Sequence, residues 1–415
     1  MQSLPLTDLR GRSRRARLLS VLYEMKRESL VGHAEELVRI IRKSTLPADA
    51  VASAYLRERS YIGATDRRYI GELVFRTLRQ LSLADALSTE DRPPAATMDD
   101  DGVQEWIQRE LATKELAVRF VDESTWCGFA PWIITELERR WTHDDVLEVG
   151  RAMMLPAPLC IRVYRRRATR QNVLAVLRKD NISCEEGKLS PDAIIIHQRV
   201  NLLQHPLYKE GIIDVQDEGS QLIGLFCDAE PGQHVLDACA GAGGKSLHLA
   251  DIMKDSGVIV ARDIEFKRLK EIGPRARRVG LTSITTELLS ARPDSARRAH
   301  NQHTSYDLVL VDAPCSGMGT IRRSPMVKWR LTQEGLSRIV RKQQQILQTN
   351  AQYVRPDGHL VYATCSILPS ENEDVVQHFL AHNPDFTLID ERQVDPYHNG
   401  TDGLYMARMR RGDAW

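Results

Sequence analysis

The spacing of apolar residues predicts helices in the first third of the chain. In "DRRYIGELVFRTLRQL" the apolar residues recur every three or four positions, which places them on one face of a helix: Ile70, Leu73, Val74, Leu78 and Leu81. "AEELVRIIRK" and "PWIITELERRW" show similar spacing. Between these helical patterns, "STEDRPPAATMDDDG" combines two prolines, an acidic run and a glycine, which predicts a loop. We therefore expect an all-helical domain over residues 1–147.

The pattern changes at "MLPAPL", where two prolines end the helical spacing. The β-branched run "CIRVY" follows, then the helical pattern "RQNVLAVLRK" and a second apolar run, "AIIIH". A helix between short strands indicates a small α/β module, which we expect over residues 148–214.

Strand and helix patterns alternate regularly over residues 215–415. The predicted strands are "HVLDAC", "VIVARD", "YDLVLVD" and "HLVYATC", and the helices between them include "EFKRLKEI" and "EGLSRIVRKQQQILQTNAQYV". "PDG" predicts a turn before the last of these strands, and Ser370 with Glu373 predicts a capping box for "ENEDVVQHFLAH". This alternation is typical of an α/β, Rossmann-like, doubly wound and mostly parallel sheet. Such sheets bind ligands at the carboxyl ends of their strands.

The composition narrows the classes of function. Hydrophobic residues make up 42% of the 415 positions, and no apolar run approaches the roughly 20 residues that span a bilayer. No apolar signal-peptide core accompanies the N-terminal arginines. The seven cysteines form no CxxC pair, which favours free thiols in a reducing compartment. We expect a cytoplasmic monomer without a membrane or metal partner.

Local basic clusters, rather than the net charge of +1, indicate a polyanionic partner. The clusters are "LRGRSRRAR", "YRRRATR", "PRARR" and "IRRSPMVKWR". A single cluster is more often a solvated surface, but four of them, one directly after Cys315, favour contact with phosphates.

The glycine-rich run "DACAGAGGKS" lies between a predicted strand and a predicted helix, and three ligands fit such a turn. A P-loop requires a glycine where Cys239 stands, and a dinucleotide fingerprint requires a third glycine where Ser246 stands. The third ligand, S-adenosylmethionine, needs small residues for close approach and an acidic residue at the end of the next strand, where Asp263 lies. A turn that binds nothing is the plainer alternative.

Two cysteines, Cys315 in "LVLVDAPCSG" and Cys365 in "LVYATCSILP", each follow a predicted strand. A thiolate is suited to adding to carbon 6 of a cytosine, which makes carbon 5 nucleophilic toward a sulfonium methyl group. The proton on carbon 5 must then leave before the thiol does, and a second group near the first helps at that stage. Either cysteine alone is more often a buried apolar filler.

An ordered set of motifs resembles the RNA cytosine-5 methyltransferases of the Sun/nucleolar-protein family. The motifs are "VQDEGSQ", "DACAGAGGKSLHLA", "DAPCSGMGTIRRSP", "KW", "YATCSILPSENEDVV" and "TDGLYMARM". Within the family, the bacterial type that modifies small-subunit rRNA is the most similar, because "GATDRRYIGELVFRTLRQL" resembles the centre of that type's NusB-like RNA-binding domain. The resemblance implies a class I methyltransferase domain over residues 215–415 and a small-subunit rRNA substrate.

The resemblance also implies roles for individual residues. Cys365 corresponds to the nucleophile and Cys315 to the thiol that assists release, an order that these residues alone leave open. Asp312 would line the cofactor and base pocket, while Lys245 would either lie near the base or only cap its helix. The S-adenosylmethionine site would comprise Cys239, Ala240, Gly241, Ala242, Gly243, Gly244, Lys245, Asp263, Ser290 and Asp312.

The chain departs from the family pattern at three positions. Ser290 stands where an acidic residue near the end of the third strand is usual, and Glu287 substitutes poorly for it by register. Met326 and Tyr164 replace a usual aspartate and asparagine. Arg322, Arg323 and Lys328 are expected to contact RNA phosphates, and Trp329 to pack. The alternatives are a tRNA cytosine-5 methyltransferase, a P-loop hydrolase and a noncatalytic rRNA-binding assembly protein.

Overall fold

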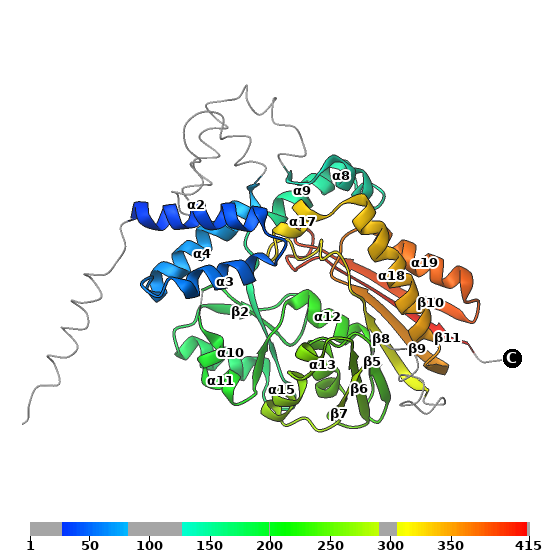
Figure 1. The fold of residues 1–415 in the computed structure, drawn as a ribbon. Coiled ribbons are helices and arrows are strands. Elements are labelled where there is room, and N and C mark those ends of the chain that lie inside the picture. Colours follow the sequence, from blue (N-terminus) through cyan, green and yellow to red (C-terminus); the bar gives the residue numbers. More distant parts are fainter. Residues whose placement is uncertain (1–26, 82–126, 199, 290–304, 413–415) are drawn as a thin grey trace, which may run out of the picture. The chain divides into compact units, whose positions relative to one another are not determined.

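The computed structural model describes residues 27–81, 127–198, 200–289 and 305–412. The chain divides into two compact units, Met1–Gly128 with Ser324–Met326, and Phe129–Arg323 with Val327–Trp415. The described part of the first unit contains the helices α2 (Arg27–Lys43), α3 (Ala48–Glu58) and α4 (Ala64–Arg79) (Figure 1). The apolar face predicted for α4 is buried. The loop predicted at "STEDRPPAATMDDDG" lies outside the described residues, and the NusB-like character of this unit stays a prediction.

The second unit begins with two helices, α8 (Pro131–Leu137) and α9 (His143–Met153), which the helical spacing had grouped with the first domain. A four-stranded antiparallel sheet follows, in the order β2-β3-β1-β4. Its strands are β1 (Leu159–Val163), β2 (Cys184–Glu186), β3 (Ala193–Ile196) and β4 (Ile213–Val215). The amphipathic helix α10 (Arg170–Lys179) buries its apolar side chains in the core of this sheet, and η2 (Leu202–Gln204) and α11 (Pro206–Lys209) complete the module.

The main sheet has seven strands in the order β10-β11-β9-β8-β5-β6-β7. They are β5 (His234–Asp237), β6 (Val258–Asp263), β7 (Ile284–Leu288), β8 (Tyr306–Asp312), β9 (Val354–Thr364), β10 (Phe386–Val394) and β11 (Leu404–Arg411). The five strands β5 to β9 run parallel, and at one edge β11 pairs antiparallel with β9 and β10 pairs antiparallel with β11. The expected doubly wound, mostly parallel sheet is therefore confirmed. Its winding reverses between β5 and β8.

Helices cover both faces of this sheet (Figure 1). One core joins the sheet to α12 (Glu218–Phe226), α13 (Gly244–Ile252) and α15 (Ile272–Val279). The other joins it to α18 (Gln333–Ala351) and α19 (Glu373–His382). Successive residues of the central strands enter opposite cores, as Val235 and Leu236 of β5 do. The remaining helices are α14 (Phe266–Leu269), α17 (Met326–Arg330) and the short η3 (Pro369–Glu371), and no described helix is long and apolar enough to cross a membrane.

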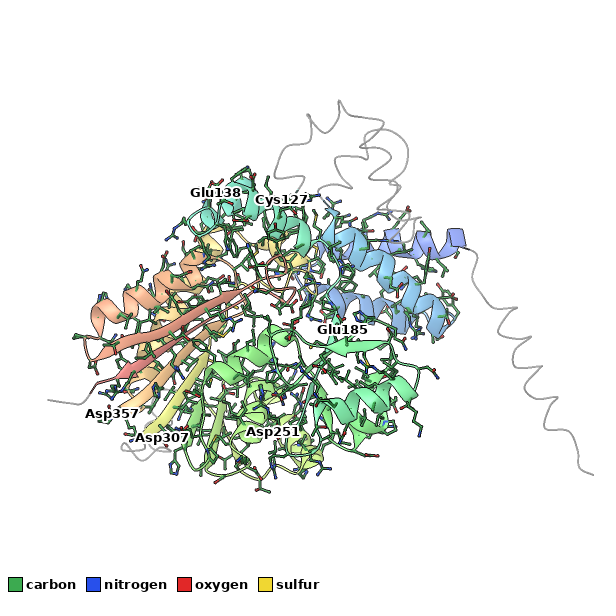
Figure 2. The ribbon with its side chains drawn as sticks, turned by 180° about the vertical axis from the view of Figure 1, so that it is seen from behind. Cys127, Glu138, Glu185, Asp251, Asp307 and Asp357 are labelled. Carbon is green, nitrogen blue, oxygen red and sulfur yellow. The ribbon has the colours of Figure 1, made fainter. Side chains whose placement is uncertain are left out.

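Polar contacts join the antiparallel module to the main sheet. Asp251 of α13, labelled in Figure 2, accepts hydrogen bonds from the backbone N–H groups of Arg165 (2.8 Å) and Arg166 (3.3 Å), just after β1. Arg162 of β1 is completely buried and donates to the carbonyl of Gly244 at the start of α13. The module therefore supports the helix that begins at the glycine-rich loop.

Two local predictions were wrong. The "PDG" residues form no turn before the strand but an irregular part of β9, where the left-handed Asp357 (φ 60°) accompanies a register shift against β8. Ser370 is not the N-cap of α19, because η3 precedes that helix and the Ser370 hydroxyl donates to Glu136 of α8 (2.6 Å). Both patterns have a local signature, but contacts with distant segments determine the backbone there.

Candidate active site

The predicted site residues gather at the carboxyl ends of four adjacent strands. In the sheet order β9-β8-β5-β6, the strand ends carry Cys365, Asp312, the glycine-rich loop after Asp237, and Asp263. Neighbouring parallel strands end at the same edge of the sheet. The winding of the chain reverses between β5 and β8, and sheets of this type bind ligands beside such a reversal. Residues separated by more than a hundred positions in sequence are thereby brought into one site.

Cys315 and Cys365 lie side by side. Their Sγ atoms are 3.1 Å apart, and both side chains are partly buried. The hydrogen bond to Cys365, together with burial, raises the pKa of the Cys315 thiol well above its usual value. The two sulfurs are thus within hydrogen-bond distance of each other, and either of them can be the donor.

Lys245, in the first turn of α13, is paired with Asp312 at the end of β8. Its Nζ lies 2.6 Å from Asp312 Oδ2, and its side chain is only 16% exposed. Burial acts to lower the pKa of Lys245, but Asp312 and, more weakly, Cys365 outweigh burial and raise it. Lys245 is thus an ammonium group within electrostatic reach of Cys365, and not a helix cap that faces solvent.

The glycine-rich loop turns tightly between β5 and α13. Gly243 has a φ of 81°, and a Cβ there would lie 2.7 Å from Ile272, so both the backbone conformation and the space require glycine. Beneath the loop, Asp237 is fully buried and accepts a hydrogen bond from Ser246 (2.6 Å). Burial is the main cause that raises the pKa of Asp237 to about 6. The carboxyl group beneath the loop therefore keeps its proton to a higher pH than an ordinary aspartate does.

Asp263 closes the other side of the loop. Its Oδ2 accepts the backbone N–H of Gly241 (2.8 Å), and its Oδ1 accepts that of Glu265 (2.7 Å). Each carboxylate oxygen has a further lone pair for a ligand hydroxyl group. Ile264 and Phe266, directly after it, are 67% and 62% exposed, which places apolar surface beside the carboxylate.

Other predicted residues are engaged within the protein. The Arg323 guanidinium pairs with Asp402 (2.5 Å) and Asp217 (2.8 Å), and Arg322 donates to the carbonyls of Pro156 and Gly400. The predicted phosphate contacts of both arginines, and that of Lys328, stay predictions. Lys328 is 4% exposed, and its Nζ lies 4.7 Å from the centre of the Trp329 ring.

The residues predicted near the third strand do not complete the site. Ser290 lies outside the described residues. Glu287 of β7 pairs with Arg262 of β6 (3.0 Å), so its carboxylate is already engaged. No group of three or more His, Cys, Asp or Glu side chains suited to a metal ion occurs within the described ranges.

The sequence did not reveal the carboxylate of Glu371, which holds the residues that follow both cysteines. It accepts hydrogen bonds from Ser316 and Ser366. The sequence shows only that a glutamate follows the second cysteine by six residues in "TCSILPSEN", and the same stretch has the pattern of a helix start.

Comparison with known proteins agrees with this architecture. Residues 225–410 match the family model for the 16S rRNA methyltransferase RsmB/F, and residues 129–203 match the ferredoxin-like domain of RsmF/B-like methyltransferases. A crystal structure of a methyltransferase homolog protein from Pyrococcus horikoshii is 25% identical, with a TM-score of 0.61, and the match covers 70% of this chain and 98% of that one.

Two curated relatives are named as ribosomal RNA small subunit methyltransferase B. The protein so named with the qualifier "probable" in Bacillus subtilis is 32% identical over 297 residues, which are 68% of this chain and 66% of that protein. The one from Shewanella oneidensis is 35% identical over 319 residues, 74% of this chain and 72% of that protein. With this identity over most of both chains, the protein belongs to the RsmB/F family of methyltransferases.

Proposed function

We propose that this methyltransferase transfers a methyl group from S-adenosylmethionine to carbon 5 of a cytosine in RNA, through a covalent bond between cysteine and cytosine. The observation that carries the proposal is the pair of thiols 3.1 Å apart beside the Lys245–Asp312 ion pair. The names of the relatives support small-subunit rRNA as the substrate.

The residues around the glycine-rich loop fit S-adenosylmethionine. Asp263 has lone pairs for the two ribose hydroxyl groups, and the exposed Ile264 and Phe266 offer apolar surface to the adenine. The small residues from Cys239 to Gly244 allow the methionine end to approach the backbone closely. When bound, S-adenosylmethionine supplies an electrophilic methyl group.

Cys365 is the proposed nucleophile. Its sulfur lies 3.1 Å from that of Cys315, from which it can accept a hydrogen bond, and it interacts electrostatically with the Lys245 ammonium group, which favours a thiolate. The thiolate adds to carbon 6 of the cytosine, and the electron pair of the ring double bond moves toward carbon 5, which becomes the methyl acceptor. Asp312 lies beside Lys245 at the same edge, where its carboxyl group can hydrogen-bond the cytosine amino group.

Cys315 is the proposed group for release. After methylation, the proton on carbon 5 must be removed so that the double bond re-forms and the bond between Cys365 and carbon 6 breaks. Once Cys365 is bound to carbon 6, the hydrogen bond that raises the pKa of Cys315 is gone, so Cys315 can release its proton to water and, as a thiolate, accept the proton from carbon 5 while Cys365 leaves as a thiolate. The family resemblance implies this order of the two roles, and the electrostatic interaction between Lys245 and Cys365 supports it.

The alternatives have less support. A P-loop hydrolase conflicts with membership in a methyltransferase family and with Cys239 at the place of the first P-loop glycine. A noncatalytic assembly protein would have no need for two adjacent thiols next to an ammonium group. A tRNA substrate remains an alternative to rRNA that an experiment can separate.

The test is a denaturing gel of protein mixed with unmodified small-subunit rRNA and S-adenosylmethionine. Cys315→Ala is expected to form a protein–RNA adduct that survives denaturation, because attack proceeds and release does not. Cys365→Ala and the double variant are expected to form none. An adduct only in Cys365→Ala would reverse the two roles, and methyl incorporation by the wild type into tRNA but not rRNA would correct the substrate.

A further inference from the structure

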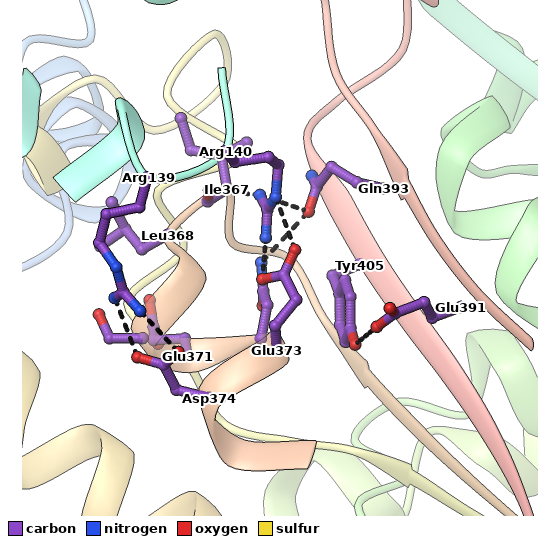
Figure 3. Close-up of polar contacts among 12 residues, drawn as sticks. Arg139, Arg140, Ile367, Leu368, Glu371, Glu373, Asp374, Glu391, Gln393 and Tyr405 are labelled. Carbon is purple, nitrogen blue, oxygen red and sulfur yellow. Dashed lines mark hydrogen bonds and ion pairs between the residues drawn. The ribbon is translucent and has the colours of Figure 1, made fainter. Parts of the chain in front are cut away.

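The carboxylate of Glu371 links the two loops that carry the thiols. The side chain is completely buried at the end of η3, and Figure 3 labels it near Asp374. Its Oε1 accepts hydrogen bonds from the backbone N–H of Ser316 (2.8 Å) and from Nε2 of Gln343 (3.0 Å). Its Oε2 accepts from the hydroxyl groups of Ser316 and Ser366 (2.6 Å). One carboxylate therefore receives four donors.

These donors determine where the cysteines lie. Ser316 follows Cys315 directly and Ser366 follows Cys365 directly, so both thiol-bearing loops are attached to the same carboxylate. Further contacts hold Glu371 itself and the residue before Cys315. The Tyr362 hydroxyl donates to the Glu371 carbonyl (2.7 Å), and Gln343 donates to the Pro314 carbonyl (3.2 Å). Each donor to the carboxylate is uncharged, which indicates a role in geometry rather than in neutralising a cation.

We propose that Glu371 is a positioning residue that sets the separation of Cys315 and Cys365 by holding Ser316 and Ser366 on one carboxylate. The catalytic consequence rests on the proposed function. If Cys365 is bound to carbon 6, Cys315 must lie within reach of the proton on carbon 5. A displacement of about 1 Å in such a geometry costs about a hundredfold in rate. Glu371 therefore acts on release through the loops and does not touch the RNA.

Two variants separate the reach of Glu371 from its charge. Glu371→Asp keeps the charge but is shorter by one C–C bond of about 1.5 Å, so its carboxylate cannot serve both loops. Glu371→Gln keeps the length and loses the charge. Its amide oxygen can still accept from Ser316 and Gln343, and the serine hydroxyl groups can rotate to accept from its NH₂ group. If Glu371 positions the two loops, the aspartate variant should slow the pairing of Cys315 with Cys365 far more than the glutamine variant does.

The first measurement needs neither RNA nor cofactor. Diamide oxidises two adjacent thiols to a disulfide: the thiols lose two electrons and two protons, and the N=N bond of diamide gains them. The rate of Cys315–Cys365 pairing, followed by peptide mass mapping, reports how close the two sulfurs stay. We expect Glu371→Asp to slow it about tenfold or more and Glu371→Gln about threefold or less.

Two further variants keep this test decisive. Asp374→Asn is the matched control, since Asp374 lies three residues away and pairs with Arg139 instead of the thiol loops; it should pair at the wild-type rate. Ser366→Ala removes one donor and leaves Glu371 in place, so it reports on positioning even if Glu371→Asp does not fold. It should slow pairing by a smaller factor. Wild-type pairing rates in both Glu371→Asp and Ser366→Ala would overturn the proposal, as would equal slowing in the aspartate and glutamine variants.

The second measurement is methyl transfer to rRNA. Glu371→Asp should lower kcat with little change in KM and should accumulate the denaturation-resistant adduct despite an intact Cys315, because release is slowed more than attack. A lowered kcat without adduct would overturn the release role. If the wild type methylates no RNA, the proposed function fails, while the diamide rates still decide whether Glu371 positions the thiols.

Discussion

Asp237 makes the stability of the glycine-rich loop depend on pH. Burial raises its pKa from 3.8 to about 6, so between these pH values the folded protein holds a proton that the unfolded chain has released. The free energy of unfolding must therefore fall as pH rises through this window and level off above about pH 6. The shift corresponds to about 3 kcal/mol, or about a hundredfold in an opening equilibrium.

Asp237→Asn removes the titrating group and keeps its shape, and the amide oxygen can still accept the hydrogen bond from Ser246. At pH 7.5 the variant should be more stable than the wild type by up to about 3 kcal/mol, and at pH 4 the two should be nearly equal. Because the chain has two compact units, a single global unfolding transition is not expected. Hydrogen exchange of peptides from β5 and α13 measures the opening locally.

The expected result is exchange up to about a hundredfold slower in Asp237→Asn at pH 7.5, with little difference at pH 4. Comparing variant and wild type at the same pH cancels the intrinsic pH dependence of exchange. Val235→Ala, a cavity variant in the same strand, is the control and should speed exchange equally at both pH values. Faster exchange of Asp237→Asn at pH 7.5 would refute the reasoning, since it would mean that the ionised carboxylate stabilises the loop.

Three other variants test the site. Lys245→Met leaves Asp312 without its cation and should lower kcat/KM for methyl transfer about tenfold to a hundredfold. It should also slow the labelling of Cys365 by iodoacetamide, and unchanged labelling would show that Lys245 does not affect the reactivity of this thiol. Gly319→Ala places a Cβ 1.7 Å from the Gly403 carbonyl oxygen and strains the segment that donates to the Cys365 carbonyl, so it should speed hydrogen exchange of the peptide that contains Cys365, and a wild-type exchange rate would show that the segment adjusts. Arg323→Gln leaves the buried Asp402 without this ion-pair partner and should speed hydrogen exchange of the peptide that contains Asp402, whereas a large loss of RNA affinity at wild-type exchange rates would favour a phosphate contact.

The parts of the fold that depend on periodic patterns could be predicted from the sequence. Alternating strands and helices predicted the parallel sheet, and because parallel strands end at one edge, Cys315 and Cys365 could be expected to lie together. Contacts between distant polar groups could not be predicted. Arg323 is in a basic cluster, but its partners Asp217 and Asp402 come from distant segments that no local pattern connects.

The same reason explains the other differences. Ser370 and Glu373 have the spacing of a capping box, yet their side chains contact Glu136 and Arg140 of the helical segment at the start of the second unit. Figure 3 shows Arg140 reaching Glu373, Gln393 and the Ile367 carbonyl. A local pattern reports which conformations a segment prefers, and tertiary contacts choose among them.

The support of the Cys365 loop has a consequence for the order in which the molecule is assembled. Arg140 and Glu373 are 233 residues apart in the chain, and Glu136 and Ser370 are 234 apart. Contacts of such high sequence separation require a large loop to close and form late in folding. On a ribosome, Arg140 emerges long before its partner has been synthesised. The loop of Cys365, the proposed nucleophile, therefore gains these contacts only when nearly the whole chain is available.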